Sequence, residues 1–504
     1  MPGRFGVGDF GPCAYEFADF LLAAGQKLWQ VLPLHPTGYG DSPYQCFSAF
    51  AGNPLLLSLE RLRERGLLGE SDLAGAPVFP EDAVDFAAAS RFKMPLLRRA
   101  AEAFFAAGAD RAEYDDFCQR AEPWLEDFSL FMALKDAHRG VAWTDWESEI
   151  RQRQPHAMRT WAGQLAAEVE AIKFWQFEFF RQWGELKSYC HQRGIRLMGD
   201  IPIYVAHDSA EVWAHPELFH LDEQGRPTVV SGVPPDYFCA TGQLWGNPIY
   251  RWELIEKDGF RWWIERFRGA FALFDLVRLD HFRGFEAYWE VPASEPTAMH
   301  GRWVQAPGDG LLTALQKEFG ELPIVAENLG VITPGVEALR AKFALPGMSI
   351  LQFAFGSDPQ GPSFRPHNYC RDLVAYTGSH DNDTAVGWWT SEGAGDSTRT
   401  AEDVRKEHAC ARAYLNFGDE AEINWVMIRA VEASVADTVI VPLQDVLGLG
   451  SAARMNLPGS MSGNWRWRCR KGALSPALSA RLRSLTALYG RVEDTPPDNV
   501  VAPA

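Results

Sequence analysis

Seven short runs of apolar, often β-branched residues recur along this 504-residue chain and constrain its fold more than any other feature. Each run ends in polar or charged residues, and long helical or loop-rich stretches separate one run from the next. That alternation favours α/β architecture with a parallel sheet. The runs cover residues 28–34, 196–205, 275–281, 323–328, 348–355, 373–379 and 438–443.

Seven strands are one short of a closed eight-stranded barrel. We expect a (β/α)8 barrel of the TIM type with helical insertions, whose first strand is missing at the N-terminus of this chain. The segment 60–187 is rich in Glu, Ala, Arg and Leu and has apolar residues spaced three and four apart, as in amphipathic helices. The predicted organisation is therefore the start of the barrel in 1–59, a helical insertion subdomain in 60–187, and the rest of the barrel in 188–504.

Charge and cysteine content exclude several classes of function. Lys and Arg number 48 against 66 Asp and Glu, a formal charge of −18, which disfavours nucleic acid or an anionic membrane as partner. The eight cysteines contain no CxxC pair, so neither a zinc site nor a dense disulfide framework is expected. The N-terminal residues do not resemble a signal peptide, and no stretch is apolar enough to span a membrane. We expect a cytoplasmic protein with reduced thiols.

Carboxylates follow several of the expected strands. Asp280 closes the run LVRLD, Glu327 closes PIVAE, and Asp381 follows AYTGSH. Catalytic side chains of such barrels lie at the C-terminal ends of the strands, where these three residues could converge. A single Asp after a strand is more often a helix cap or a solvated loop residue. It is the joint occurrence of the three that predicts a site.

Two of these carboxylates suit retaining glycoside chemistry, in which one attacks the anomeric carbon while the other protonates the leaving oxygen and then deprotonates the acceptor. The first must stay ionised and the second protonated near neutral pH, so their environments must differ. Arg278, two residues before Asp280, lies on the same strand face and can hold that carboxylate ionised. Glu327 follows the apolar residues 324–326, which favour its protonated form. The residues therefore predict Asp280 as nucleophile and Glu327 as acid.

The motifs around these residues resemble those of a known family. RLDHFRGFE (278–286), VAENLG (325–330) and GSHDNDT (378–384) look like the ordered motifs of the 4-α-glucanotransferases, the amylomaltases of glycoside hydrolase family 77, which are related to the α-amylases. The segments 29–56, 199–213, 232–252 and 442–468 are also similar, so the resemblance touches nearly the full length. One departure is that the family normally begins with a first barrel strand, whereas this chain opens at MPGRFGVGDFG.

The resemblance implies roles for specific residues. It implies Asp280 as nucleophile, Glu327 as general acid/base and Asp381 as the group that grips sugar hydroxyls and distorts the ring. The expected substrate-binding residues are Arg278, His380, Asp236, Trp245, Asn247, Asp200 and Tyr44. Alternatives stay open for some of them: His380 as a structural histidine, the loop with Asp236, Trp245 and Asn247 as a rigid loop that packs its own aromatics, and Tyr44 as a buried tyrosine.

The activity implied by the resemblance is transglycosylation. A segment of α-1,4-glucan would pass through a covalent glycosyl-enzyme on Asp280 to glucose or to another α-1,4-glucan. The expected partners are maltooligosaccharides and glucans derived from starch or glycogen, with glucose as acceptor. Neither a metal nor another cofactor is expected, since no His/Glu/Asp cluster has metal-ligand spacing. An α-amylase-like hydrolase and an inactive glucan-binding protein are the alternatives.

Overall fold

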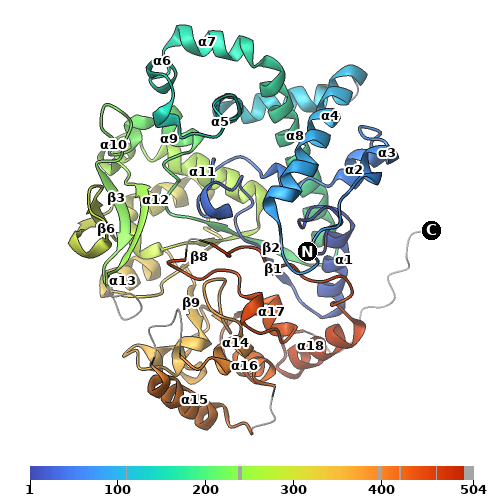
Figure 1. Ribbon diagram of the computed structural model, residues 1–504. Coiled ribbons are helices and arrows are strands. Elements are labelled where there is room, and N and C mark those ends of the chain that lie inside the picture. Colours follow the sequence, from blue (N-terminus) through green and yellow to red (C-terminus); the bar gives the residue numbers. More distant parts are fainter. Residues whose placement is uncertain (109–110, 236–240, 394–399, 419–421, 461, 493–504) are drawn as a thin grey trace.

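Seven parallel strands form the centre of the molecule, one at each predicted run. The computed structural model describes residues 1–108, 111–235, 241–393, 400–418, 422–460 and 462–492 (Figure 1). Four strands form one sheet in the order β1-β2-β5-β8, three form another in the order β11-β10-β9, and all these pairs are parallel. Their bounds are Leu28–Gln30 (β1), Arg196–Ile201 (β2), Leu276–Leu279 (β5), Ile324–Ala326 (β8), Gly347–Ile350 (β9), Leu373–Tyr376 (β10) and Thr438–Ile440 (β11). The predicted α/β class is confirmed.

The two parallel sheets continue into one another and share an apolar interior. The amide of Ala326 in β8 donates a 2.8 Å hydrogen bond to the carbonyl of Pro346, just before β9. On the far side, the Tyr376 hydroxyl of β10 donates to Gln30 of β1 at 3.1 Å. Strands β8 and β9 are buried along their whole length, as expected of parallel strands covered on both faces. The buried cluster between the sheets contains Met198, Val325, Met348, Ile350, Val374 and Tyr376.

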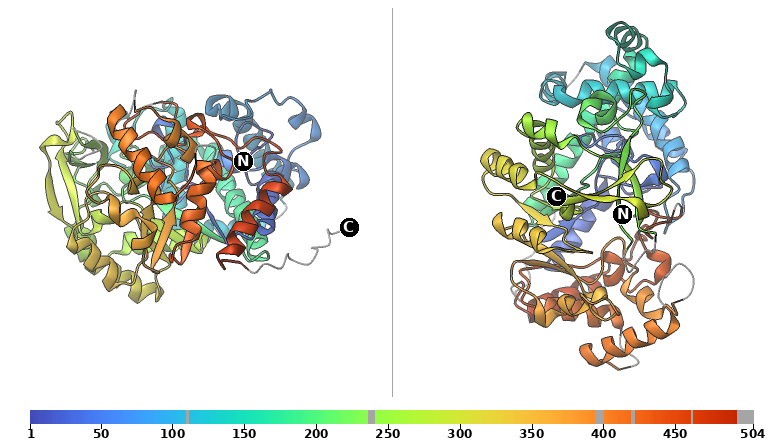
Figure 2. Two further views of the ribbon diagram at one scale, coloured as in Figure 1. Left: turned by 90° about the horizontal axis from the view of Figure 1, so that it is seen from below. Right: turned by 90° about the vertical axis from the view of Figure 1, so that its left-hand side faces the viewer.

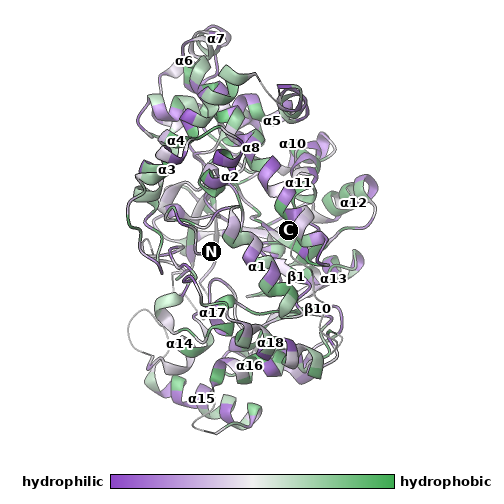
Figure 3. Ribbon diagram, turned by 90° about the vertical axis from the view of Figure 1, so that its right-hand side faces the viewer, coloured by the Kyte–Doolittle hydropathy of each residue, from purple (hydrophilic) through white to green (hydrophobic). Residues whose placement is uncertain are grey.

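Helices pack around these sheets (Figure 2). Hydrophilic and apolar positions alternate along several helices, such as α15 and α18 (Figure 3). Every helix within the described ranges is too short or too polar to cross a bilayer. The helices outside 60–187 are α1 Pro12–Ala23, α9 Ala210–Ala214, α10 Trp252–Lys257, α11 Arg261–Leu273, α12 Gly308–Phe319, α13 Pro334–Lys342, α14 Ala385–Thr390, α15 Ala401–Leu415, α16 Ile423–Glu432, α17 Leu443–Val446 and α18 Pro476–Leu488.

The long connection between β1 and β2 contains the helices α2 to α8, of which α5, α6 and α7 lie at the top of Figure 1. One of its helices, α8, also packs on the sheet layer. The Trp175 indole of α8 donates to the Leu97 carbonyl of α4, whereas the Trp183 indole donates to the Leu273 carbonyl of α11. The helices are α2 Leu59–Glu64, α3 Glu70–Ala74, α4 Phe86–Ala107, α5 Arg111–Ala137, α6 Ser148–Arg151, α7 Pro155–Gln164 and α8 Ala166–His191.

A four-stranded antiparallel sheet beside the parallel strands was not predicted from the sequence. Its order is β4-β3-β6-β7, with β3 Val229–Val233, β4 Gln243–Pro248, β6 Ala287–Pro292 and β7 Arg302–Gln305. Strand β4 contains Gly246, whose φ is +79°, and ends at Pro248. Glycine and proline are depleted in strands, so the local sequence hides this sheet.

Candidate active site

The ends of three neighbouring strands bring four of the predicted residues together. Asp200 of β2 is in register with Arg278 of β5, and Arg278 is in register with Val325 of β8. Asp280 directly follows β5 and Glu327 directly follows β8. Because the three strands are parallel and adjacent, both carboxylates emerge at the same edge of the sheet.

Arg278 bridges two carboxylates. Its Nη1 donates to Asp200 Oδ2 at 2.7 Å and its Nη2 lies 2.8 Å from Asp280 Oδ1. Burial would lower the pKa of Arg278, but the charges of Asp200 and Asp280 raise it well above its usual value. The side chain of Asp280 is 28 % exposed, whereas that of Asp200 is fully buried. Arg278 therefore holds the more open carboxylate in a fixed orientation with a charge-assisted bond.

Glu327 lies in a different environment from Asp280. It is buried, and its Oε2 and Oε1 accept hydrogen bonds from the backbone amides of His281 (2.8 Å) and Leu329 (2.9 Å). Burial raises the pKa of Glu327 to about 7; the Arg278 charge acts against this rise and the Asp280 charge adds to it. One carboxyl group is thus suited to give up a proton near neutral pH, beside a carboxylate that is paired with a cation.

His281 was not predicted as a site residue, although it stands inside the RLDHF motif. Its backbone is in the left-handed region (φ 49°, ψ 52°), which is uncommon for a residue with a side chain. This conformation directs its amide back to Glu327. Its ring meets the Trp245 ring edge to face at 4.8 Å, and burial lowers the pKa of His281 to about 4, so the ring is neutral. The peptide after Asp280 therefore ties the two carboxyl groups together.

The loop 378–384 after β10 contributes His380 and Asp381. The Asp381 carboxylate is about half exposed, and its Oδ1 accepts a 2.7 Å hydrogen bond from Asn456 Nδ2. The Arg454 guanidinium donates to the Asp381 carbonyl at 2.6 Å. His380 Nε2 lies 3.6 Å from Asp381 Oδ1. Segment 454–456 thus holds both the carboxylate and the backbone carbonyl of Asp381.

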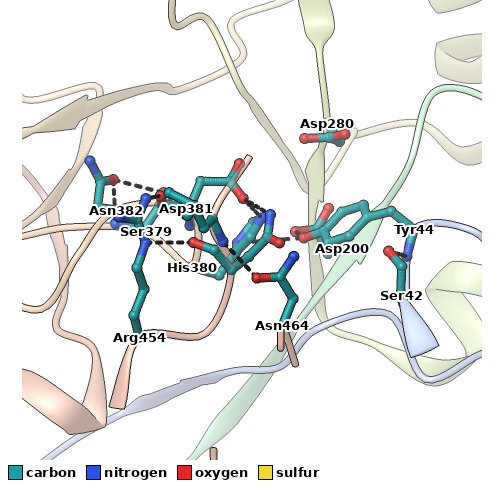
Figure 4. A network of polar contacts seen from close by, with 12 residues as sticks. Ser42, Tyr44, Asp200, Asp280, Ser379, His380, Asp381, Asn382, Arg454 and Asn464 are labelled. Atoms are coloured by element: carbon teal, nitrogen blue, oxygen red, sulfur yellow. Dashed lines mark hydrogen bonds and ion pairs between the residues drawn. The ribbon is translucent and has the colours of Figure 1, made fainter. Parts of the chain in front are cut away.

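Tyr44 connects this loop to the strand residues (Figure 4). Its hydroxyl donates to Asp200 Oδ2 at 2.9 Å and lies 3.5 Å from His380 Nδ1. The Tyr44 and His380 rings stack with centroids 5.1 Å apart, and the Trp465 ring lies 5.6 Å from the first and 5.8 Å from the second. A continuous polar network therefore runs from Asp280 to Asp381 through Arg278, Asp200, Tyr44 and His380.

The remaining predicted residues differ in their placement. Trp245 lies beside His281, at the edge of the carboxylate group. Asn247 of β4 is buried, and its amide donates to the Val205 carbonyl and accepts from Gln45, so its hydrogen bonds join three segments of the chain. Asp236 lies outside the described residues.

Sequence reasoning also missed Asn456, Arg454 and Trp465 as parts of the site. All three residues lie in the segment 442–468, and the similarity of this segment to the family was the signal that could have identified them. No group of three His, Cys, Asp or Glu side chains arranged to hold a metal occurs in the part of the chain that the structure describes.

Comparisons with known proteins identify the family of this chain. The family model described as 4-alpha-glucanotransferase matches residues 1–474. A 4-alpha-glucanotransferase of Thermus thermophilus is 53% identical over 501 residues, covering 98% of this chain and 97% of the relative. One from Synechocystis is 50% identical over 497 residues, covering 97% and 96%. The amylomaltase of Streptococcus agalactiae, solved in complex with acarbose, superposes with a TM-score of 0.92 at 38% identity and covers 98% of this chain and 97% of its own. The chain therefore belongs to the 4-alpha-glucanotransferase family.

Proposed function

We propose that this chain transfers segments of α-1,4-glucan to glucose or to another α-1,4-glucan by a retaining double displacement. The observation that carries the proposal is the pairing of a partly exposed, Arg278-bound carboxylate on Asp280 with a buried, amide-bound carboxyl on Glu327. Retaining glycoside chemistry requires such a pair. The expected partners are maltooligosaccharides and glucans derived from starch or glycogen, with glucose as acceptor.

The two carboxyl groups divide the reaction between them. Asp280 attacks the anomeric carbon, so that a bond to its carboxylate forms while the bond to the leaving oxygen breaks, and Glu327 gives its proton to that oxygen. Glu327, now ionised, takes the proton of the acceptor 4-hydroxyl as the acceptor oxygen displaces Asp280. Arg278 aims the Asp280 carboxylate for the first attack and pairs with the negative charge that returns to this carboxylate when the acceptor oxygen displaces it. No redox or metal chemistry is needed for this balance.

The loop 378–384 and Trp245 are proposed to bind the sugars. His380 and the half-exposed Asp381 would bond donor-sugar hydroxyls, with Tyr44 fixing His380 against Asp200. Trp245, an aromatic side chain beside the carboxyl pair, would stack on a sugar ring. If sugar rather than water fills the acceptor position while the covalent intermediate exists, transfer is favoured over hydrolysis.

The barrel, the division of the chain into segments and the cellular location are proposals as well. We infer that the seven strands belong to a (β/α)8 barrel whose first strand would lie between β1 and β11. Within the described ranges β1 pairs only with β2, and β11 pairs only with β10. The hydrogen bond from Tyr376 of β10 to Gln30 of β1 supports the closeness of these two sheet edges. We keep the division into 1–59, a helical subdomain 60–187, and 188–504. In the part of the chain that the structure describes, all seven cysteines have free thiols, which supports action in the cytoplasm.

Maltotriose alone is expected to yield both shorter and longer maltooligosaccharides and free glucose, with constant total reducing ends. Each transfer breaks one α-1,4 bond and makes another, so the number of chains does not change. Chromatography of the products over time, together with a reducing-end assay, measures this. Rising reducing ends without longer products would indicate the α-amylase-like hydrolase, and binding without any products the inactive glucan-binding protein. A parallel reaction with EDTA should proceed at the same rate.

The kcat/KM for maltotriose is expected to fall as pH rises through about 7. The acid must be protonated in the free enzyme, and burial raises the pKa of Glu327 to about 7. Raising the pH removes this proton, so the loss approaches about tenfold per pH unit above the pKa. Initial rates at low maltotriose across the neutral and alkaline range measure it. A rate that stays flat to two units above neutrality would contradict the assignment of the acid.

A further inference from the structure

The segment 443–456 forms several hydrogen bonds to the loop 378–384, which we propose binds sugar. The backbone amide of Asn456 donates to the His380 carbonyl at 3.0 Å. The Ser451 hydroxyl donates to Asp383 Oδ2 at 2.7 Å. Together with the two hydrogen bonds to Asp381 described above, this segment bonds three residues of the loop, His380, Asp381 and Asp383. The loop is therefore held by a segment that lies about 70 residues further along the chain.

One residue of that segment, Asp445, binds both ends of the loop. Its Oδ2 accepts from the hydroxyl of Thr377, the residue after β10, at 2.6 Å. Its Oδ1 accepts from the backbone amide of Ala385, the first residue of α14, at 2.7 Å. Every residue of the loop 378–384 lies between these two anchors. A single carboxylate therefore fixes the distance that the loop must span.

The Asp445 carboxylate is almost completely buried, with 1 % of the residue exposed. A buried carboxylate is costly unless its oxygens are hydrogen-bonded, and here both are. The charged group that most affects it is Asp383, another carboxylate, and burial together with this repulsion raises the pKa of Asp445 to about 6. The main chain of Asp445 is held as well, because Asn424 Nδ2 donates to its carbonyl at 2.8 Å. The two loop anchors are therefore short, directed and formed on a fixed support.

We propose that Asp445 is a positioning residue for glucan transfer, which fixes the loop carrying His380 and Asp381 through Thr377 and Ala385. The inference rests on the proposed function of that loop. Asp445 touches neither the carboxyl pair nor the sugar in this scheme. Loss of its anchors would let the loop relax, so that Asp381 loses the geometry in which it meets the distorted sugar ring.

Asp445→Asn in the full chain tests the inference. The amide keeps the shape but removes the charge and has only one acceptor oxygen, so the Thr377 hydroxyl must reverse to accept from the NH2 group and both anchors become weaker, neutral hydrogen bonds. We expect kcat for maltotriose disproportionation to fall by roughly 10- to 100-fold with a smaller change in KM, because the lost contacts matter most in the transition state. Thr377→Val removes one anchor and should lower kcat less, whereas Thr377→Ser keeps the hydroxyl and should restore it.

The matched control is Asp403→Asn. Asp403 is an exposed carboxylate on α15 that also accepts from a threonine hydroxyl and a backbone amide, both of Thr400. Its replacement removes the same kind of interactions far from the loop. The kcat of this variant should equal that of the wild type.

A double-mutant cycle with His380→Ala separates positioning from general destabilisation. If Asp445 acts through the loop, the two substitutions should be clearly less than multiplicative in kcat, because each removes the same contribution. Multiplicative effects, or an Asp445→Asn variant with wild-type kcat, would overturn the inference. If Asp445→Asn does not fold, the Thr377→Val and Thr377→Ser pair decides in the same cycle. Failure of the proposed function itself would show separately, as a wild-type enzyme that makes no longer oligosaccharides.

Discussion

Asp280→Asn is expected to lower kcat/KM for maltotriose disproportionation by roughly ten-thousand-fold or more, with little effect on folding. The substitution removes the nucleophile, so the covalent intermediate cannot form, and an amide next to Arg278 loses the charge that this guanidinium holds in place. The guanidinium of Arg278 is buried but keeps its ion pair with Asp200, so the replacement leaves no buried charge unpaired. Initial rates of glucose release, with thermal unfolding of the same preparations, measure both parts.

A matched control lies at the opposite end of the same strand. Asp275 precedes β5 and accepts hydrogen bonds from His191 and from the Leu197 amide. Asp275→Asn changes the same functional group on the same strand, and its activity per folded molecule should be that of the wild type. If Asp280→Asn kept more than about a hundredth of wild-type activity, a different residue would have to supply the nucleophile.

Glu327→Gln is expected to lower the same rate by roughly a thousandfold or more and to remove the alkaline fall in the pH profile. The amide cannot donate the proton that the leaving oxygen needs. It also places an NH2 group against the backbone amide of either His281 or Leu329, so a moderate loss of stability should accompany the loss of activity. Rates measured against pH, corrected for the folded fraction, report both effects.

The leaving group of the donor distinguishes an acid from a merely structural glutamate. A donor whose leaving group is already a weak base, such as a nitrophenyl maltoside, needs little protonation, so the Glu327→Gln defect in forming the covalent intermediate should shrink. The Asp280→Asn defect should not. Glu318→Gln, on the surface of α12, provides the control substitution. An equal defect with both donors would remove Glu327 from the role of acid.

The relation of Asp280 to Arg278 was predictable because it is local. Two residues apart on a strand share a face, whatever the rest of the fold. The apolar residues 324–326 likewise predict a buried strand, so we expected the carboxyl group of Glu327, the next residue, to lie in an apolar environment. The buried, raised-pKa glutamate and the Arg278-bound aspartate agree with these expectations. The catalytic roles built on them stay predictions.

Contacts between distant segments could not be predicted in this way. The two readings left open for Tyr44 were a sugar contact and a buried tyrosine, and its hydroxyl instead joins Asp200 to His380, 156 and 336 residues away. The amide of Asn247 likewise bonds Val205 and Gln45, 42 and 202 residues away, and neither contact could be read from the local sequence. Residue type sets what a side chain can bond, whereas its partner is fixed only when the loops are in place.

The sequence by itself determined the seven parallel strands, the family and the strand ends that carry carboxylates, because hydrophobic periodicity and short motifs act over a few residues. The tertiary structure alone decided the left-handed turn at His281, the antiparallel sheet, and the anchoring of the loop 378–384 by Asp445. These features depend on backbone hydrogen bonds and burial between segments far apart in the chain. Such contacts stabilise the protein only after both segments have come together, so no pattern within one segment can predict them.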